Sequence, residues 1–270
     1  MKLGGFIRLV CLLIAVSFFN SCMVKEVRVD CPCWLSFVFD ELSEDVDSVT
    51  VSGWRDCVLF CEVLNSISGI APHEIKVPKG LVRTCVYSGI EKSVLDGYRV
   101  MVPLGEQADS LFYHRNSVRC DDEFAVDTVK LCKHWTNVRV RLVIDGTKAD
   151  MSFTDDGYDF VVRSTVCGTD MLNESPVYGT FRFVPEKSAD GSFEFRIMRH
   201  DGDAEELYMD IYKDGVHVDD MKLGKQLISA GYDWSESDLS DVDMVLNTTS
   251  RDVFITVKPW VDQGEEDIIF

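Results

Sequence analysis

The chain has 270 residues, with 27 Lys or Arg against 46 Asp or Glu, so its formal net charge at pH 7 is −19. Hydrophobic residues make up 46% and charged residues 27%, which is typical of a globular protein with a buried core. The negative charge argues against nucleic acid and anionic lipid headgroups as partners, because both would repel it. The length suits one large or two ordinary domains.

The N-terminus has the layout of an export signal. Lys2 and Arg8 give a positive start, and residues 9–19 form an apolar core that ends shortly before Cys22. This core is too short to span a membrane, which takes about 20 residues. We therefore predict a signal peptide over residues 1–21.

Ser21 followed by Cys22 resembles a lipobox, the motif in which the cysteine is acylated and becomes the first residue of a lipoprotein. Phe19 and Asn20 depart from the residues usual in a lipobox. We predict lipidation at Cys22. The alternative is an ordinary secretory signal followed by a free cysteine.

Ten cysteines are present, and eight of them follow Cys22, namely Cys31, Cys33, Cys57, Cys61, Cys85, Cys120, Cys132 and Cys167. In an exported protein an even number favours disulfide bonds, although eight thiols allow many pairings and the sequence does not choose among them. An anaerobic host would leave several thiols reduced. Their spacings match no Cys/Cys or Cys/His motif for zinc.

Alternating apolar and polar residues predict strands in the first half of the chain. Residues 34–40 place Leu35, Phe37 and Phe39 on one face. Strands are also predicted at residues 48–51, 98–103 and 121–134, whereas the apolar run at residues 57–64 suits a helix or a strand.

The second half has a clearer β pattern, with strands predicted at residues 137–144, 158–162, 181–183, 193–197, 207–211, 216–218, 242–246 and 253–260. Asp190-Gly191 and Asp214-Gly215 predict hairpins between the runs that flank them. Residues 223–229 are the one short helix predicted, and Gly231 ends it.

Short strands at a steady spacing with almost no helix predict an all-β protein built from β-sandwiches. We expect two in tandem, an N-terminal domain over residues 22–135 and a C-terminal domain over residues 136–270. No internal repeat is visible at the residue level.

Motifs of catalysis are missing from the sequence, which has no GxSxG nucleophile, P-loop, dinucleotide fingerprint or HExxH helix. The acidic loops at residues 155–157 and 201–206 lack the ligand spacing of an EF-hand and are interpreted as solvated turns. The five Trp residues are interpreted as core or corner residues in preference to a sugar-binding platform. We predict a non-enzymatic protein without a cofactor or metal.

Four features carry a resemblance to a known family. They are the lipobox at Cys22, the segment Asp30-Cys31-Pro32-Cys33-Trp34-Leu35-Ser36-Phe37, the motif Gly97-Tyr98-Arg99-Val100, and the closing Thr256-Val257-Lys258-Pro259-Trp260. The element at residues 223–231 is also similar. Together they resemble the fimbrillin-associated anchor lipoproteins of Bacteroidota.

The resemblance implies two transthyretin-like β-sandwiches in series, a lipid anchor in the outer membrane through acylated Cys22, and a place at the base of a fimbrium. The partner would be the fimbrial stalk subunit, bound by strand exchange. In related stalk subunits, proteolytic removal of the first strand opens the acceptor groove. Here that strand lies close to Cys22, so its loss would cut the anchor, and we expect it to stay. Arg28 is the alternative cleavage point.

The C-terminal tail is the candidate contact with the stalk subunit, through Asp262, Gly264, Ile268, Ile269 and Phe270. Its alternative is a frayed acidic end. Two other function classes stay open. One is a surface glycan-binding lipoprotein, and the other is a fimbrial tip adhesin.

Overall fold

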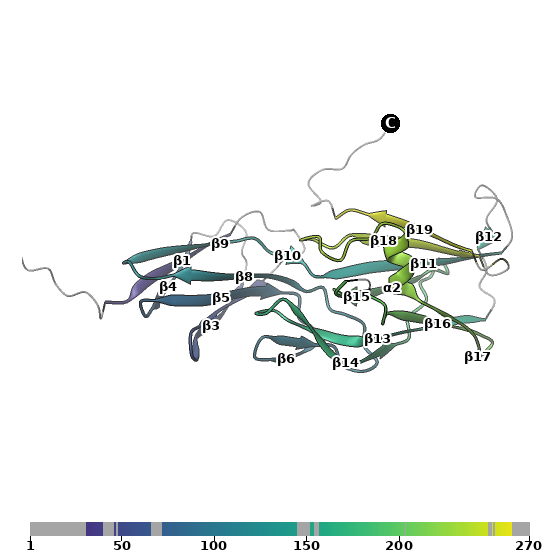
Figure 1. Cartoon of the computed structure of the whole chain (residues 1–270), viewed down its shortest axis with the longest axis horizontal. Helices are drawn as coiled ribbons and strands as arrows, with labels where there is room; N and C mark the ends of the chain where they lie inside the picture. The colour runs from purple at the N-terminus through teal and green to yellow at the C-terminus, as the bar shows by residue number, and fades with distance from the viewer. Residues whose placement is uncertain are drawn as a thin grey trace, which may run out of the picture.

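The computed structural model describes residues 31–39, 46, 48–65, 72–144, 152–153, 157–202, 204–247, 250 and 252–260. The predicted lipidation site Cys22 and the predicted contact residues Asp262, Gly264, Ile268, Ile269 and Phe270 lie outside them. Figure 1 shows two β-rich halves arranged end to end along the longest axis of the molecule. Among the helices of the described residues, none is long and apolar enough to cross a membrane.

Two sheets form the N-terminal half. Its strands are β1 (Cys33–Phe39), β2 (Ser48–Trp54), β3 (Val58–Asn65), β4 (His73–Val77), β5 (Leu81–Ser88), β8 (Phe112–Arg119), β9 (Phe124–Val129) and β10 (Cys132–Lys133), in the orders β4-β1-β9 and β10-β8-β5-β2-β3. β1 pairs antiparallel with β4 and parallel with β9, so it is the central strand of its sheet. Cys33, Leu35 and Phe37 of β1 are fully buried because alternate residues of a strand face the same side.

Two further sheets form the C-terminal half. The first has the order β12-β11-β18-β19, with β15 also paired to β11, and comprises β11 (Trp135–Ile144), β12 (Ser152–Phe153), β15 (Phe193–Met198), β18 (Asp241–Asn247) and β19 (Val253–Lys258). The second has the order β17-β16-β13-β7-β6, with β14 also paired to β13, and comprises β6 (Val94–Asp96), β7 (Arg99–Met101), β13 (Tyr158–Asp170), β14 (Ser175–Phe183), β16 (Tyr208–Lys213) and β17 (Val216–Met221). The helix α2 (Leu223–Ser229) follows β17.

The C-terminal core lies between these two sheets. Val138 and Val140 of β11 are fully buried, as is Phe160 of β13 on the facing sheet. Aromatic rings meet across the layers, since Phe160 packs edge-on against Phe193 with ring centroids 4.7 Å apart. Such aromatic pairs add to the stabilisation that comes from burying apolar area.

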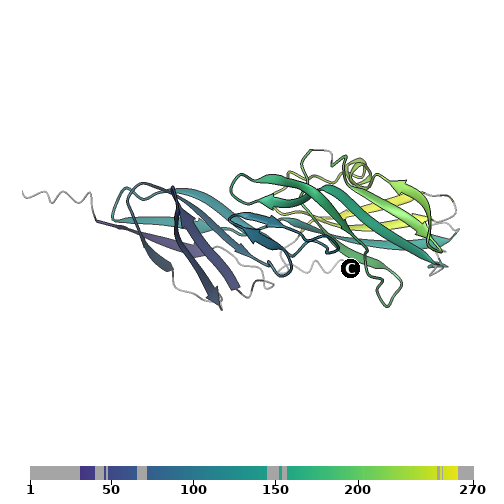
Figure 2. The ribbon, with the colours of Figure 1, turned by 90° about the horizontal axis from the view of Figure 1, so that it is seen from below.

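The β6–β7 hairpin joins the two halves. It belongs to the chain before residue 135, yet β7 pairs with the end of β13 at Arg99↔Asp170 and Gly168↔Met101. Gly168 is required there, because a Cβ atom on it would lie 2.1 Å from the carbonyl oxygen of Val100. Figure 2 shows the blue and green ribbons meeting in the middle of the elongated molecule.

The predicted all-β class is confirmed, and so is the helix at residues 223–229. The ambiguous run at residues 57–64 is strand β3, and the predicted hairpin at Asp214-Gly215 joins β16 to β17. The domain boundary near residue 135 stays a prediction.

The hairpin predicted at Asp190-Gly191 is wrong. β14 and β15, the strands that flank this turn, belong to different sheets, where β14 pairs with β13 and β15 with β11. The physical reason is that both runs place Phe residues inward. Phe183 and Phe195 face each other across the core with centroids 5.7 Å apart, so the chain crosses between layers here.

Candidate functional site

A groove opens between two edge strands of the C-terminal half, β17 and β19. β17 and β19 are the last strands of their sheets, and within the described part of the chain neither has a neighbour on its outer side. An edge strand presents backbone N–H and C=O groups that an added strand can pair with. A pocket of about 570 Å³ lies between β17 and the β18–β19 pair, and α2 closes one end of it.

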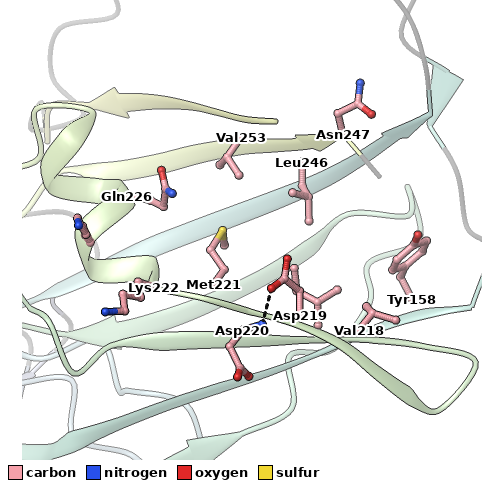
Figure 3. Close-up of a pocket in the computed structure, with 12 residues that line it drawn as sticks. Tyr158, Val218, Asp219, Asp220, Met221, Lys222, Gln226, Leu246, Asn247 and Val253 are labelled. Carbon is pink, nitrogen blue, oxygen red and sulfur yellow. Dashed lines mark hydrogen bonds between the residues drawn. The ribbon is translucent and has the colours of Figure 1, made fainter. Parts of the chain in front are cut away.

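The groove has an apolar floor and a polar rim. Met221 and Leu246 are buried in the floor, whereas Val218 on β17 is 42% exposed. Lys222 and Gln226 come from the start and middle of the helical segment and stand at the rim, as Figure 3 shows. The arrangement suits a ligand with an apolar side and a polar backbone or hydroxyl groups.

An ion-pair network lies beside the groove, on β13, β16 and β17. His217 Nε2 lies 2.8 Å from Asp220 Oδ1, and Arg163 Nε donates to both carboxylate oxygens of Asp210 at 2.9 Å. The hydrogen bond from His217 is the main cause that holds the pKa of Asp220 below its usual value.

Asp210, His217 and Asp220 bring one ligand atom each within 4.8 Å of one another, a spacing that a metal ion would accept. However, Arg163 already pairs with Asp210 and its Nη2 lies 3.8 Å from Asp220. The guanidinium therefore supplies the cation of the cluster, and its charge would repel a metal ion. We interpret the cluster as a structural network.

The end of the described chain is held at the junction between the halves. Lys133 is fully buried, and its ammonium lies 4.3 Å from the ring centroids of both Trp135 and Trp260. It donates to Asp241 Oδ1 at 2.6 Å and to the carbonyl oxygen of Leu239 at 3.1 Å. Desolvation by burial lowers the pKa of Lys133, and the Asp241 carboxylate opposes that shift. Trp260, the last residue that the structure describes, therefore lies near the middle of the molecule.

The predicted first strand is an integral part of its sheet. β1 begins eleven residues after Cys22 and makes a ladder with β4 from Cys33↔Val77 to Phe37↔His73, and another with β9 from Trp34↔Phe124 to Phe39↔Val129. Removing β1 would separate β4 from β9 and expose a hydrophobic core.

Sequence reasoning missed the groove and the Lys133 cluster. Lys133 lies in an unremarkable Cys-Lys-His-Trp run, and its partner Asp241 is more than a hundred positions away. The Trp residues gave the available signal, because Trp135 and Trp260 were expected to be core or corner residues and both flank Lys133.

No protein-family model and no curated protein matches the chain. Among solved structures, a candidate polysaccharide-binding protein of Bacteroides thetaiotaomicron is similar, with a TM-score of 0.64 and 15% identity over 86% of this chain and 100% of that one. A candidate adhesin of Bacteroides ovatus has a TM-score of 0.62 and 14% identity over 86% and 95%. The fimbrial anchor protein Mfa2 of Porphyromonas gingivalis has a TM-score of 0.59 and 13% identity over 86% and 99%. At these identities the likeness establishes a fold shared with fimbrial and adhesin-like proteins.

Proposed function

We propose that this chain is a non-enzymatic cell-surface lipoprotein that anchors a fimbrium to the outer membrane and binds the stalk subunit by strand exchange. The observation that carries the proposal is the central position of β1, which connects the segment after Cys22 to two neighbouring strands. A subunit whose first strand stays in place retains its link to the membrane. It ends the polymer, because β1 keeps the place in its sheet that a donor strand would otherwise take.

The fold likeness to a fimbrial anchor protein over 86% of this chain supports the same role. The position of Trp260 also supports it, because this last described residue lies at the junction between the halves, beside Lys133. In strand exchange, main-chain hydrogen bonds supply affinity and alternate side chains fill pockets. Ile268 and Phe270 are alternate apolar residues of the kind that such pockets accept.

The decisive experiment replaces Cys22 with Ala in the native host. We expect the variant to lose its lipid label and assembled fimbriae to be shed into the medium. The matched control is Cys31→Ala, an exposed cysteine nine positions later, which should keep both the label and cell-bound fimbriae. Fimbriae that stay on cells carrying the Cys22→Ala variant would overturn the proposal.

The groove favours a second candidate, a surface glycan-binding lipoprotein. Its 570 Å³ volume is in the range of small-ligand sites, and Tyr158 in its lining offers an aromatic ring to a sugar. A glycan array would test this candidate, with Tyr158→Ala as the variant that should lose the signal. A tip adhesin, the remaining alternative, would lie at the distal end of fimbriae in immunogold images.

A further inference from the structure

Two cysteine side chains meet at one end of the N-terminal half. Cys33 is the first residue of β1, and Cys120 directly follows β8 in the other sheet. Both are fully buried in the same hydrophobic core, and their thiols lie close enough that each influences the pKa of the other. The contact therefore bridges the two sheets.

The backbone fixes this contact. Val77 lies opposite Cys33 in the β1–β4 ladder, and three residues later Gly80 exchanges both backbone hydrogen bonds with Cys120, at 2.8 and 3.2 Å. Val77 and Gly80, at the two ends of the short turn between β4 and β5, thus hold Cys33 and Cys120 near each other. The two cysteines are therefore brought together by paired backbone and not by a flexible loop.

Cys85 provides the contrast. It is also fully buried. Ser52 of β2 lies opposite Cys85 of β5 on one side and opposite Cys61 of β3 on the other, so one strand separates the two cysteines. Two strand spacings amount to about 9.5 Å. That exceeds the Cα separation of about 7 Å beyond which a disulfide cannot form without backbone movement.

We infer that Cys33 and Cys120 form an inter-sheet disulfide bond in the exported protein. The thiolate of one cysteine attacks a sulfur of an incoming protein disulfide, and the second cysteine resolves the mixed disulfide. One S–S bond forms within this chain while the incoming S–S bond breaks. Two electrons and two protons pass from the cysteine pair to the incoming disulfide, which leaves as two thiols.

The exchange takes place before β1 docks. In the folded protein both sulfurs are shielded from solvent, and burial raises the pKa of the Cys120 thiol to about 12, so little thiolate is present. Once formed, the bond is shielded from reductants for the same reason. In the folded state the thiol pair is thus neither an exchange catalyst nor a sensor.

The consequence rests on the proposed anchoring function. A pull that is transmitted along the chain to β1 acts first on Cys33, where the ladders of β1 resist it. A bond from Cys33 to Cys120 passes the load to the sheet of β8 at the first residue of the strand. It also keeps β1 attached after a backbone cut between Phe39 and Val46.

The test is a peptide map of the full-length protein from host membranes. Free thiols are alkylated with N-ethylmaleimide under denaturing conditions, and the digest is analysed without reduction. We expect one linked peptide pair that contains Cys33 and Cys120 and separates on reduction. Both cysteines recovered as alkylated peptides without reduction would overturn the inference.

Matched variants give a second readout. Because the folded protein shields the bond, each sample is reduced in denaturant and refolded with the reductant present. This treatment should lower the thermal midpoint of the wild type and of Cys85→Ala, relative to the untreated protein, but leave that of the Cys33→Ala/Cys120→Ala double variant unchanged. A wild-type midpoint that is the same after reduction in denaturant and refolding as before contradicts the bond. Neither readout depends on fimbriae, so failure of the disulfide and failure of the anchoring function are told apart by these assays and by the Cys22→Ala experiment.

Discussion

At the residue scale, the described structure depends on a few buried polar groups that hold distant segments together. Lys133 contacts Trp135, Trp260 and Asp241, and His200 lies between Ser164 and the backbone of Met198. Burying a polar group without a hydrogen-bond partner costs free energy of folding. Removing a partner of Lys133 or His200 should therefore lower stability by more than the loss of that side chain's own packing. Both clusters give predictions that separate charge from packing.

Asp241→Asn should destabilise the protein more than Lys133→Met. The first change leaves a fully buried ammonium without its counter-charge, which costs about 3 kcal/mol, whereas the second removes the charge and keeps apolar volume beside the two Trp rings. Urea unfolding at pH 7 measures both. The control is Lys258→Met, which breaks a surface pair with Asp243 and should cost less than about 1 kcal/mol. Equal losses for the first two variants would contradict this account.

His200 should make stability depend on pH between about 4 and 6.5. Its Nδ1–H donates to the carbonyl oxygen of Met198 at 2.9 Å and its Nε2 accepts from the Ser164 hydroxyl at 2.9 Å, while burial lowers its pKa to about 4. In that window the unfolded chain binds more protons than the folded chain, so stability falls as the pH falls.

The total change from this group is about 3 kcal/mol. A His200→Gln variant should show a shallower loss of stability between pH 6.5 and 4, measured by urea unfolding at stepped pH. Above pH 7 the wild-type and variant curves should run parallel, because His200 is neutral there in both states. Equal slopes in the acidic window would refute the assignment.

At the element scale, the burial of apolar faces determines which strands pair, and the turn between two consecutive strands has less influence. The β6–β7 hairpin leaves its own half to extend the sheet of β13, and β14 and β15 separate although a good turn joins them. The same logic makes β1 a central strand, because it has a partner on each side. Strand partners are chosen by the apolar faces that must be buried, and turn residues only permit the connection.

The segment after Trp260 is predicted to be the element that binds the stalk subunit. Truncation after Trp260 keeps the residue that packs beside Lys133, so we expect an intact body that no longer copurifies the stalk subunit. Copurification from host membranes measures the loss, and a thermal midpoint close to that of the full chain serves as the folding control. Undiminished copurification would rule out the tail as donor.

At the scale of the whole molecule, the two halves are connected by more than the chain. A cluster of buried side chains bridges them, with Trp54 and Tyr113 on the N-terminal side and Met171 on the other. Arg199 adds to this, since its Nε donates to His134 Nδ1 at 3.0 Å and its Nη2 to the carbonyl oxygen of Ser237 at 2.9 Å. These contacts hold the two halves to each other.

We therefore expect the wild type to unfold in one cooperative transition, with Trp fluorescence and far-ultraviolet circular dichroism giving the same urea midpoint. Arg199→Met removes the side-chain hydrogen bonds to residues 133–134 and to residues 234–237, and should separate the two midpoints. Arg182→Met, a charged residue on β14, is the control that should keep them together. Two transitions in the wild type would show that the halves are independent.

The sequence by itself determined the all-β class, the single helix among the described residues and the inward faces of strands such as β1 and β11. These follow from alternation and turn residues, which act over a few neighbouring positions. It also carries the residues behind the predicted lipobox at Cys22 and the proposed donor tail, which are linear patterns. The tertiary structure alone decided the partners of β14 and β15, the transfer of the β6–β7 hairpin, the groove, the site of Lys133 and the contact of Cys33 with Cys120. These depend on which apolar faces pack together and on residues up to about a hundred positions apart, and no local pattern records such pairings.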